Sequence, residues 1–199
     1  MRSLFNFIVS PDGDRYSNSV KVGDKDLILN TEVFNHQYVN RYAIVLKEPV
    51  VNDTSIKKGD KLVVHHNVFR RWHNVKGVEK NSRSFMGGNE YAISDDQVFL
   101  HKSVDSEDWK AMKGFCFVQP LKSTDSFDME TERPLIGIVE YTDGTHKKGD
   151  LVGFTPVSEY EFIIGGKRLY RVMTKFITIK YEYTGNEEEY NPSWADSSR

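Results

Sequence analysis

The sequence contains a single cysteine, Cys116, among its 199 residues. One cysteine excludes a disulfide within the chain and fits a reducing compartment. No apolar run approaches the ~20 residues that a membrane-spanning helix needs. The apolar run near the N-terminus is too short for a secretory signal peptide and has no small-residue cleavage site after it. We therefore expect a cytoplasmic protein with no membrane partner.

An excess of charge of one sign is also lacking. Lys and Arg total 27 and Asp and Glu total 29, which gives a formal net charge of −2. This balance provides no bulk attraction for nucleic acid, so we expect no nucleic-acid partner. Hydrophobic residues make up 38% of the chain and aromatic residues 13%, which is enough to bury a core. The length suits one large domain or two small ones.

Residue patterns typical of catalysis or metal binding are missing. His65 and His66 are adjacent and would point to opposite faces of a strand, and His73 has no partner in a zinc-binding motif. The pair Asp95 and Asp96 is explained by a turn before a strand. The two glycine pairs lack the Lys-Ser/Thr of a phosphate loop. We expect a protein that is not an enzyme and that needs no metal or cofactor.

A repeat is the strongest feature that the sequence does contain. IKKGDKLV begins at Ile56 and HKKGDLVGF begins at His146, so the equivalent glycines Gly59 and Gly149 lie 90 positions apart (149 − 59). Three other blocks recur in the same order. They are FNFIVSP with FCFVQP, YAIVLKEP with LIGIVEYT, and GGNEYAISDDQVFLHK with GGKRLYRVMTKFITIKYEY. Four blocks in one order indicate a tandem duplication.

The repeated blocks are β in character. Aromatic and β-branched residues alternate with polar ones in FNFIV, EYEFII and FITIKYEY, and Gly-Asp before an apolar run is typical of a turn that leads into a strand. Only residues 106–114 have a helical pattern, and we expect a short helix there that links the units. We expect an all-β protein with a first unit at 1–104, a second at 105–185 and a flexible polar tail at 186–199.

The order of these blocks resembles the GroES-type co-chaperonins, the ten-kilodalton chaperonin family, over most of residues 3–183. The resemblance implies two tandem, partly open β-barrels that assemble with other copies into a ring. It implies a lid that caps a GroEL-type chaperonin in its nucleotide-bound state, with the ATPase belonging to that partner. Tandem units are known in plastid members and diverged ones in bacteriophages. The loose match here resembles a viral branch, which would act in the host cytoplasm.

The resemblance places a mobile docking loop at about 12–40 and its apolar tripeptide at Leu27, Ile28 and Leu29. The alternative is that these three residues form an ordinary buried strand. In the second copy the equivalent loop is shorter by 15 residues and has no aliphatic tripeptide. It has either lost docking ability or retains a reduced contact through Phe127 and Met129.

A long basic and aromatic segment at 65–88 has no counterpart of equal length in the second copy. Its residues Phe69, Arg70, Arg71 and Trp72 are of types that are frequent at interfaces. The alternative is a solvated hairpin with one buried aromatic side chain. The stretches where the family has its roof hairpin are short, so a cage built from this chain would have an open or thin roof.

Three functions follow from these observations. The first is a co-chaperonin that assists protein folding. The second is a virion structural or interaction protein that keeps the GroES-like barrel without chaperonin binding. The third is a barrel that binds a small ligand. Ring size and symmetry, the client protein and the source organism are left open by the sequence.

Overall fold

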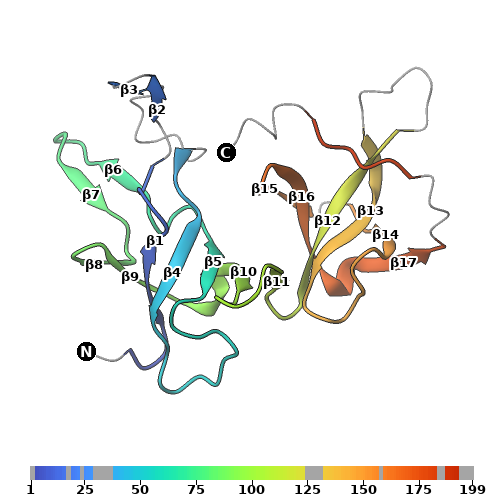
Figure 1. Cartoon of the computed structure of the whole chain (residues 1–199), viewed down its shortest axis with the longest axis horizontal. Helices are drawn as coiled ribbons and strands as arrows, with labels where there is room; N and C mark the ends of the chain where they lie inside the picture. Colours follow the sequence, from blue (N-terminus) through green and yellow to red (C-terminus); the bar gives the residue numbers. More distant parts are fainter. Residues whose placement is uncertain are drawn as a thin grey trace. The chain divides into compact units, whose positions relative to one another are not determined.

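A computed structural model describes residues 3–16, 19–22, 25–28, 38–123, 132–156, 159–182 and 187–192. The chain divides into two compact units, Met1–Trp109 and Lys110–Arg199. Strands dominate both units (Figure 1), and the described residues contain no α-helix. The described residues include the short 3-10 helices η2 (Asp95–Gln97) and η3 (Thr174–Phe176). The all-β class expected from the sequence is confirmed.

The main sheet of the first unit places its strands in the order β10-β5-β4-β1-β9-β8, with antiparallel neighbours. The strands are β1 (Phe7–Pro11), β4 (Tyr42–Lys47), β5 (Lys61–Val64), β8 (Phe85–Gly87), β9 (Glu90–Ile93) and β10 (Val98–Lys102). Apolar side chains of β1 and β9, among them Phe7, Val9, Tyr91 and Ile93, are fully buried. Their aromatic and β-branched types explain both the strand conformation and the core.

Two further pairs of strands in the first unit stay outside this main sheet. The strands β2 (Ser19–Val22) and β3 (Lys25–Ile28) pair with each other, as do β6 (Arg71–His73) and β7 (Glu79–Asn81). Figure 1 shows both pairs as ribbons separate from the main sheet.

The sheet of the second unit has the order β15-β16-β12-β13-β14-β17, again with antiparallel neighbours. It follows the short strand β11 (Lys110–Ala111). Its members are β12 (Phe115–Lys122), β13 (Glu132–Thr142), β14 (Leu151–Phe154), β15 (Glu159–Ile164), β16 (Lys167–Met173) and β17 (Ile177–Tyr181). The core of this unit gathers Cys116, Val118, Val139, Val152 and Val172.

The two units share one strand order and one register. Read from β8, the first order is β8-β9-β1-β4-β5-β10. The repeated sequence blocks in β9, β1, β4, β5 and β10 lie at the same places as β16, β12, β13, β14 and β17 in the second order. Val9 lies opposite Val45 and Tyr91 in the first unit. In the second unit Val118 lies opposite Val139 and Tyr170. The repeated sequence blocks therefore occupy equivalent structural positions.

The two Lys-Lys-Gly-Asp turns are built with the same hydrogen bonds. The amide of Gly59 donates to the carbonyl of Val45, and that of Gly149 to Val139, both at 2.8 Å. In each turn the aspartate carboxylate accepts a bond from the amide of the first lysine, at 2.8 Å in the first unit and 3.1 Å in the second. Both glycines have a φ near +90° (93° and 87°), a conformation that side chains disfavour. The repeated tetrapeptide is thus a structural turn.

The prediction of a linker helix at 106–114 is wrong. This stretch consists of irregular backbone, the two-residue strand β11 and a turn at 113–114. Trp109 contacts residues of the first unit: its ring lies 6.1 Å from that of Tyr42 and 5.3 Å from the Lys102 ammonium. A helix this short is unstable on its own, so these tertiary contacts decide the conformation.

Two other features differ from a simple pair of barrels and a loose tail. Neither main sheet closes on itself in the described part of the chain. Residues 187–192, which were expected to belong to a flexible tail, are bonded to the second unit. The Tyr190 amide donates to the carbonyl of Pro120 at 2.8 Å, and the Asn191 side chain donates to the carbonyl of Gly166 at 3.0 Å.

Candidate docking site

The excursion that follows β1 leaves and re-enters the first unit through a narrow neck. We define this neck as Arg15, Tyr16, Val39 and Asn40. Tyr16 and Val39 form an isolated antiparallel bridge, and the Asn40 amide donates to the carbonyl of Arg15 at 2.9 Å. Both Tyr16 and Val39 are buried. The chain before residue 17 and the chain after residue 38 are therefore held together at one point.

The side chain of Asn40 fixes the chain that leads into the neck. Its amide nitrogen donates to the carbonyls of Asp12 and Asp14, at 3.0 and 2.8 Å, and its oxygen accepts from the Tyr42 amide at 2.8 Å. One side chain thus satisfies three backbone groups that no strand would satisfy.

The predicted docking residues lie within the excursion. Leu27 and Ile28 belong to β3, where they lie opposite Val20 and Ser19 of β2. Leu29 lies outside the described residues. The segment 12–40 is therefore not a continuous loop, because a hairpin occupies part of it. This hairpin pairs with no strand of the main sheet.

Arg15 ties the neck to the segment that carries β6 and β7. Its guanidinium donates to the carbonyl of Phe69 at 2.9 and 3.1 Å, and to the side-chain oxygen of Asn81 at 2.8 Å. It also lies 5.4 Å from the ring centroid of Tyr91 and 5.8 Å from that of Phe85. Burial lowers the pKa of Arg15 from its ordinary value, yet an arginine remains protonated at neutral pH.

Tyr16 makes a second link between the same parts. Its hydroxyl oxygen accepts a hydrogen bond from the amide of Arg71 at 2.7 Å. The Arg71 guanidinium lies 5.0 Å from the Tyr16 ring centroid and forms an ion pair with Glu79 at 3.3 Å. The neck and the hairpin of β6 and β7 are therefore joined by hydrogen bonds and a cation–π contact.

The four predicted interface residues occupy different environments. Phe69 is fully buried and meets Tyr91 edge to face, with ring centroids 4.8 Å apart. It belongs to the core, so it cannot line a surface of the folded chain. Arg70 is partly buried, and Arg71 is bonded to Tyr16 and Glu79. Trp72 is the exposed residue of the four, with 44% of its surface open to solvent.

The corresponding region of the second unit is fastened differently. Phe127 and Met129 lie outside the described residues. At the base of this shorter excursion Leu121 forms a bridge with Glu189, and the amide of Lys122 donates to the carbonyl of Glu188 at 2.9 Å. The Glu132 carboxylate accepts from the Tyr170 hydroxyl at 2.6 Å and pairs with Arg168. Burial, followed by this bond to Glu132, raises the pKa of the Tyr170 hydroxyl.

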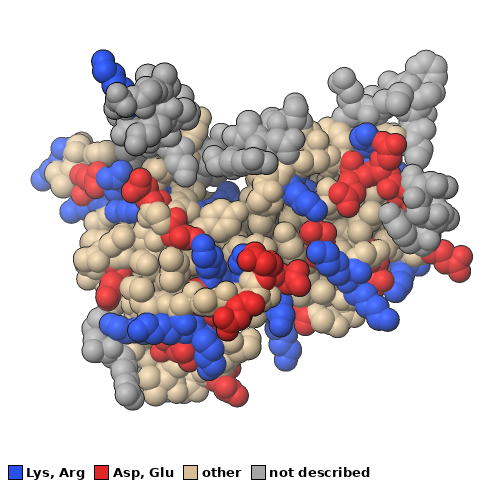
Figure 2. All heavy atoms as spheres, in the orientation of Figure 1, with Lys and Arg blue, Asp and Glu red and all other residues tan. Residues whose placement is uncertain are grey.

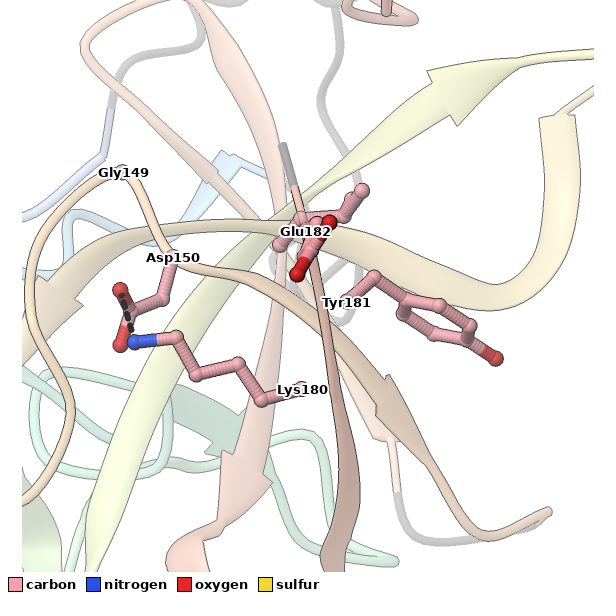
Figure 3. Close-up of a pocket in the computed structure, with 6 residues that line it drawn as sticks. Gly149, Asp150, Lys180, Tyr181 and Glu182 are labelled. Carbon is pink, nitrogen blue, oxygen red and sulfur yellow. Dashed lines mark ion pairs between the residues drawn. The ribbon is translucent and has the colours of Figure 1, made fainter. Parts of the chain in front are cut away.

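A shallow hollow of about 620 Å³ lies on the second unit. It is lined by Gly149, Asp150, Leu151, Lys180, Tyr181 and Glu182. Figure 3 shows the Asp150 carboxylate and the Lys180 ammonium directed at each other, while the Tyr181 ring points away from the pair. The two charged groups lie 2.8 Å apart and neutralise each other. Glu182 is the only other charged residue in the lining, so the hollow offers no concentrated charge to a ligand.

Other kinds of site find little support in the described residues. Among them, no group of three or more His, Cys, Asp or Glu side chains is placed to hold a metal ion. Acidic and basic side chains are mixed over the face seen in Figure 2. Across the same described residues, no helix combines the length and the apolar character needed to cross a membrane.

Sequence reasoning missed Arg15 and Tyr16. Their partners, Phe69, Asn81 and Arg71, are more than 50 positions away in the chain, so no local pattern marks them. Comparison of the chain with known protein families, with curated proteins and with solved structures finds no match.

Proposed function

We propose that this protein is a co-chaperonin of the GroES type. It would assemble as a ring and cap a GroEL-type chaperonin in its nucleotide-bound state, without catalysis of its own. Leu27, Ile28 and Leu29 would dock on the chaperonin, and each unit would be a GroES-like, partly open barrel. Its place of action would be the cytoplasm, which is the host cytoplasm if the chain is viral.

One observation carries the proposal: the chain repeats one strand order and one register in two units, and each unit has an excursion after the first strand of its main sheet. Strands β1 and β12 are equivalent, and residues 12–41 and 123–131 follow them. This is the position in which the family has its docking loop. The proposal rests on these residues and their arrangement alone, since no match to a known protein adds to it.

The neck explains how such an excursion would work. Its bonds hold the two positions where the excursion begins and ends, Tyr16 and Val39, against each other on the first unit. Aliphatic side chains are each worth up to about 1.5–3 kcal/mol when an apolar groove buries them fully. Ordering the segment on binding would cost about 2–5 kcal/mol. A single copy would therefore bind weakly, and a ring of copies would bind by avidity.

The hairpin of β2 and β3 adds to this account. Pairing of β2 with β3 fixes the backbone around Leu27 and Ile28 in an extended conformation. A partly ordered segment loses less conformational entropy on docking than a loop without structure. The chaperonin would then recognise one end of a hairpin.

Capture of a purified GroEL-type chaperonin tests the proposal. The full chain is immobilised, and the chaperonin is added without nucleotide, with ADP and with ATP. The test variant combines Leu27→Asp, Ile28→Asp and Leu29→Asp. A matched control combines Leu4→Asp, Val50→Asp and Val51→Asp, which adds the same charge at three positions of the first unit that are more than half exposed.

The expected result is nucleotide-dependent capture by the natural chain and by the control, and loss of capture in the test variant. Absence of capture under every nucleotide condition would contradict the proposed function. Undiminished capture by the test variant would contradict the docking role of the three residues.

The second candidate is a structural or interaction protein of a virion. The observation that favours it is the strand conformation of Leu27 and Ile28, because paired strands are also a common way to build permanent contacts between copies of a chain. Co-purification with virus particles, together with no capture of chaperonin, would decide for it.

A further inference from the structure

The hairpin of β6 and β7 is a feature of the first unit only. Residues 65–84 separate β5 from β8, whereas residues 155–158 separate the equivalent strands β14 and β15. The excursion after β1 is likewise the longer of the two excursions. Arg15 and Tyr16 bond these two enlarged segments to each other. The features that distinguish the first unit from the second therefore form one connected structure.

The tip of the hairpin is held in one conformation. The Asn74 amide donates to the carbonyl of Val78 at 3.0 Å, and the Gly77 amide donates to the carbonyl of Asn74 at 2.9 Å. The Asn74 side-chain oxygen also accepts from the amides of Lys76 and Val78, both at 3.0 Å. Side chains on this turn are thus presented with little backbone freedom to lose on binding.

The hairpin has one bonded face and one free face. Residues opposite each other in an antiparallel pair share a face, and successive pairs alternate between the faces. Arg71, opposite Asn81, and Glu79 lie on the face that is bonded to Arg15 and Tyr16. Trp72 lies opposite Lys80 on the other face.

The free face and the tip expose apolar side chains that no core requires. Val75 is fully exposed, Val78 is 50% exposed and Trp72 is 44% exposed. Lys76 and Lys80 are exposed among them. The hairpin has one carboxylate, Glu79, and Arg71 pairs with it on the bonded face. A complementary partner surface is therefore apolar and flanked by carboxylates.

We propose that the free face and the tip of the hairpin of β6 and β7 form a second contact with the chaperonin on which the excursion docks. The inference rests on the proposed function and names a second part of the same binding surface. Because the neck is bonded to the hairpin of β6 and β7, a partner that holds the excursion would also meet this hairpin, and a surface with apolar and acidic side chains would match Trp72, Val75 and the two lysines. Two joined contacts raise the residence time of a complex without a stronger tripeptide.

Binding of the full chain to the GroEL-type chaperonin with ADP, measured by biolayer interferometry, tests the inference. One variant combines Trp72→Ser and Val75→Ser, and another combines Lys76→Glu and Lys80→Glu. Their controls, in the second unit, are Tyr160→Ser with Ile179→Ser, about half exposed, and Lys110→Glu with Lys113→Glu, both exposed. All these changes are on the surface, so thermal unfolding should show each variant folded.

Both hairpin variants are expected to dissociate about tenfold to a hundredfold faster than the natural chain, with the controls unchanged. The charge variant should also lose most of the dependence of binding on salt. If the natural chain binds and both hairpin variants bind equally well, the second contact is overturned and the proposed function stands. If the natural chain does not bind, the proposed function is contradicted, and this inference, which rests on it, is contradicted as well.

Discussion

The hydroxyl oxygen of Tyr16 accepts a hydrogen bond from the backbone amide of Arg71 at 2.7 Å. These two residues are 55 positions apart, and their bond joins the neck of the excursion to the hairpin of β6 and β7. Tyr16 is 8% exposed, so water cannot easily replace a lost partner. The contact therefore supports the stability of the first unit and the link between the neck and the hairpin of β6 and β7.

The variant Tyr16→Phe tests the importance of this bond. It removes the acceptor while it keeps the ring, and it leaves the Arg71 amide without this partner. We expect the free energy of unfolding to fall by about 1–2 kcal/mol, measured by urea unfolding. The control is Tyr160→Phe, because Tyr160 is 52% exposed and its hydroxyl can bond water. An equal loss in the two variants would show that the bond to Arg71 contributes nothing specific.

A pair of matched glycine variants tests the equivalence of the two units. Gly59 and Gly149 have φ values of 93° and 87°, a region that costs an L-residue about 1–2 kcal/mol. A Cβ at 59 would also lie 3.1 Å from the Cγ2 atom of Val104, whose side chain is exposed and can move. We expect Gly59→Ala and Gly149→Ala to lower the free energy of unfolding by similar amounts. Urea unfolding measures this.

The control for both variants is Lys58→Ala, an exposed position of the first turn where φ is not positive. It should change the stability by less than about 0.5 kcal/mol. A neutral Gly149→Ala beside a costly Gly59→Ala would argue that the two turns are not under the same constraint.

Much of the fold could be predicted because its signals are local. Alternating apolar residues marked the strands around Val9 and Val118, and Lys-Lys-Gly-Asp marked the turns at Gly59 and Gly149. The helix expected at 106–114 failed for a tertiary reason. Its pattern was weak, and the contacts of Trp109 with Tyr42 and Lys102 outweigh a marginal propensity.

The candidate site was harder to predict than the fold. Phe69 was grouped with its neighbours by residue type, but its side chain is buried in the core and Trp72 is the exposed residue. Leu27 and Ile28 resembled a loop motif, but they pair with β2, whose short and partly polar sequence SVKV is a weak strand signal. A contact between distant segments, Phe69 with Tyr91, decided the first outcome, and pairing between two adjacent short strands decided the second.

The reactivity of Cys116 gives a probe for opening of the second unit. The thiol is fully buried, and burial, followed by the negative charge of Asp143, raises its pKa to about 12. Since the thiolate is the reactive form, we expect a thiol-specific disulfide reagent to react at least about a hundredfold more slowly than with glutathione at neutral pH. Urea should restore the ordinary rate. Fast reaction of the folded chain would contradict the burial of this residue.

The ion pair between Asp150 and Lys180 predicts how the second unit responds to acid. A hydrogen bond from the Lys180 ammonium lowers the pKa of the Asp150 carboxyl, and the Lys147 amide lowers it further. A lowered pKa stabilises the fold above the unfolded pKa of about 3.9, and this contribution is lost as the pH falls through the folded value. Lys180→Met should therefore be less stable than the natural chain at neutral pH, by less than about 1 kcal/mol because the lysine is largely exposed.

The difference in stability between the natural chain and Lys180→Met should shrink as the pH falls below the ordinary range of a carboxyl group. It should vanish once Asp150 is protonated in both proteins. Hydrogen exchange measures this difference within the second unit, in one peptide that covers the turn and β14 and another that covers β17 with Lys180. The control is Lys113→Met, which removes an exposed ammonium elsewhere in this unit. A deficit in Lys180→Met that stays constant from neutral to acid pH would mean that the lysine stabilises the sheet through packing of its alkyl chain. A deficit that disappears in acid would assign it to the charge pair that closes the second turn.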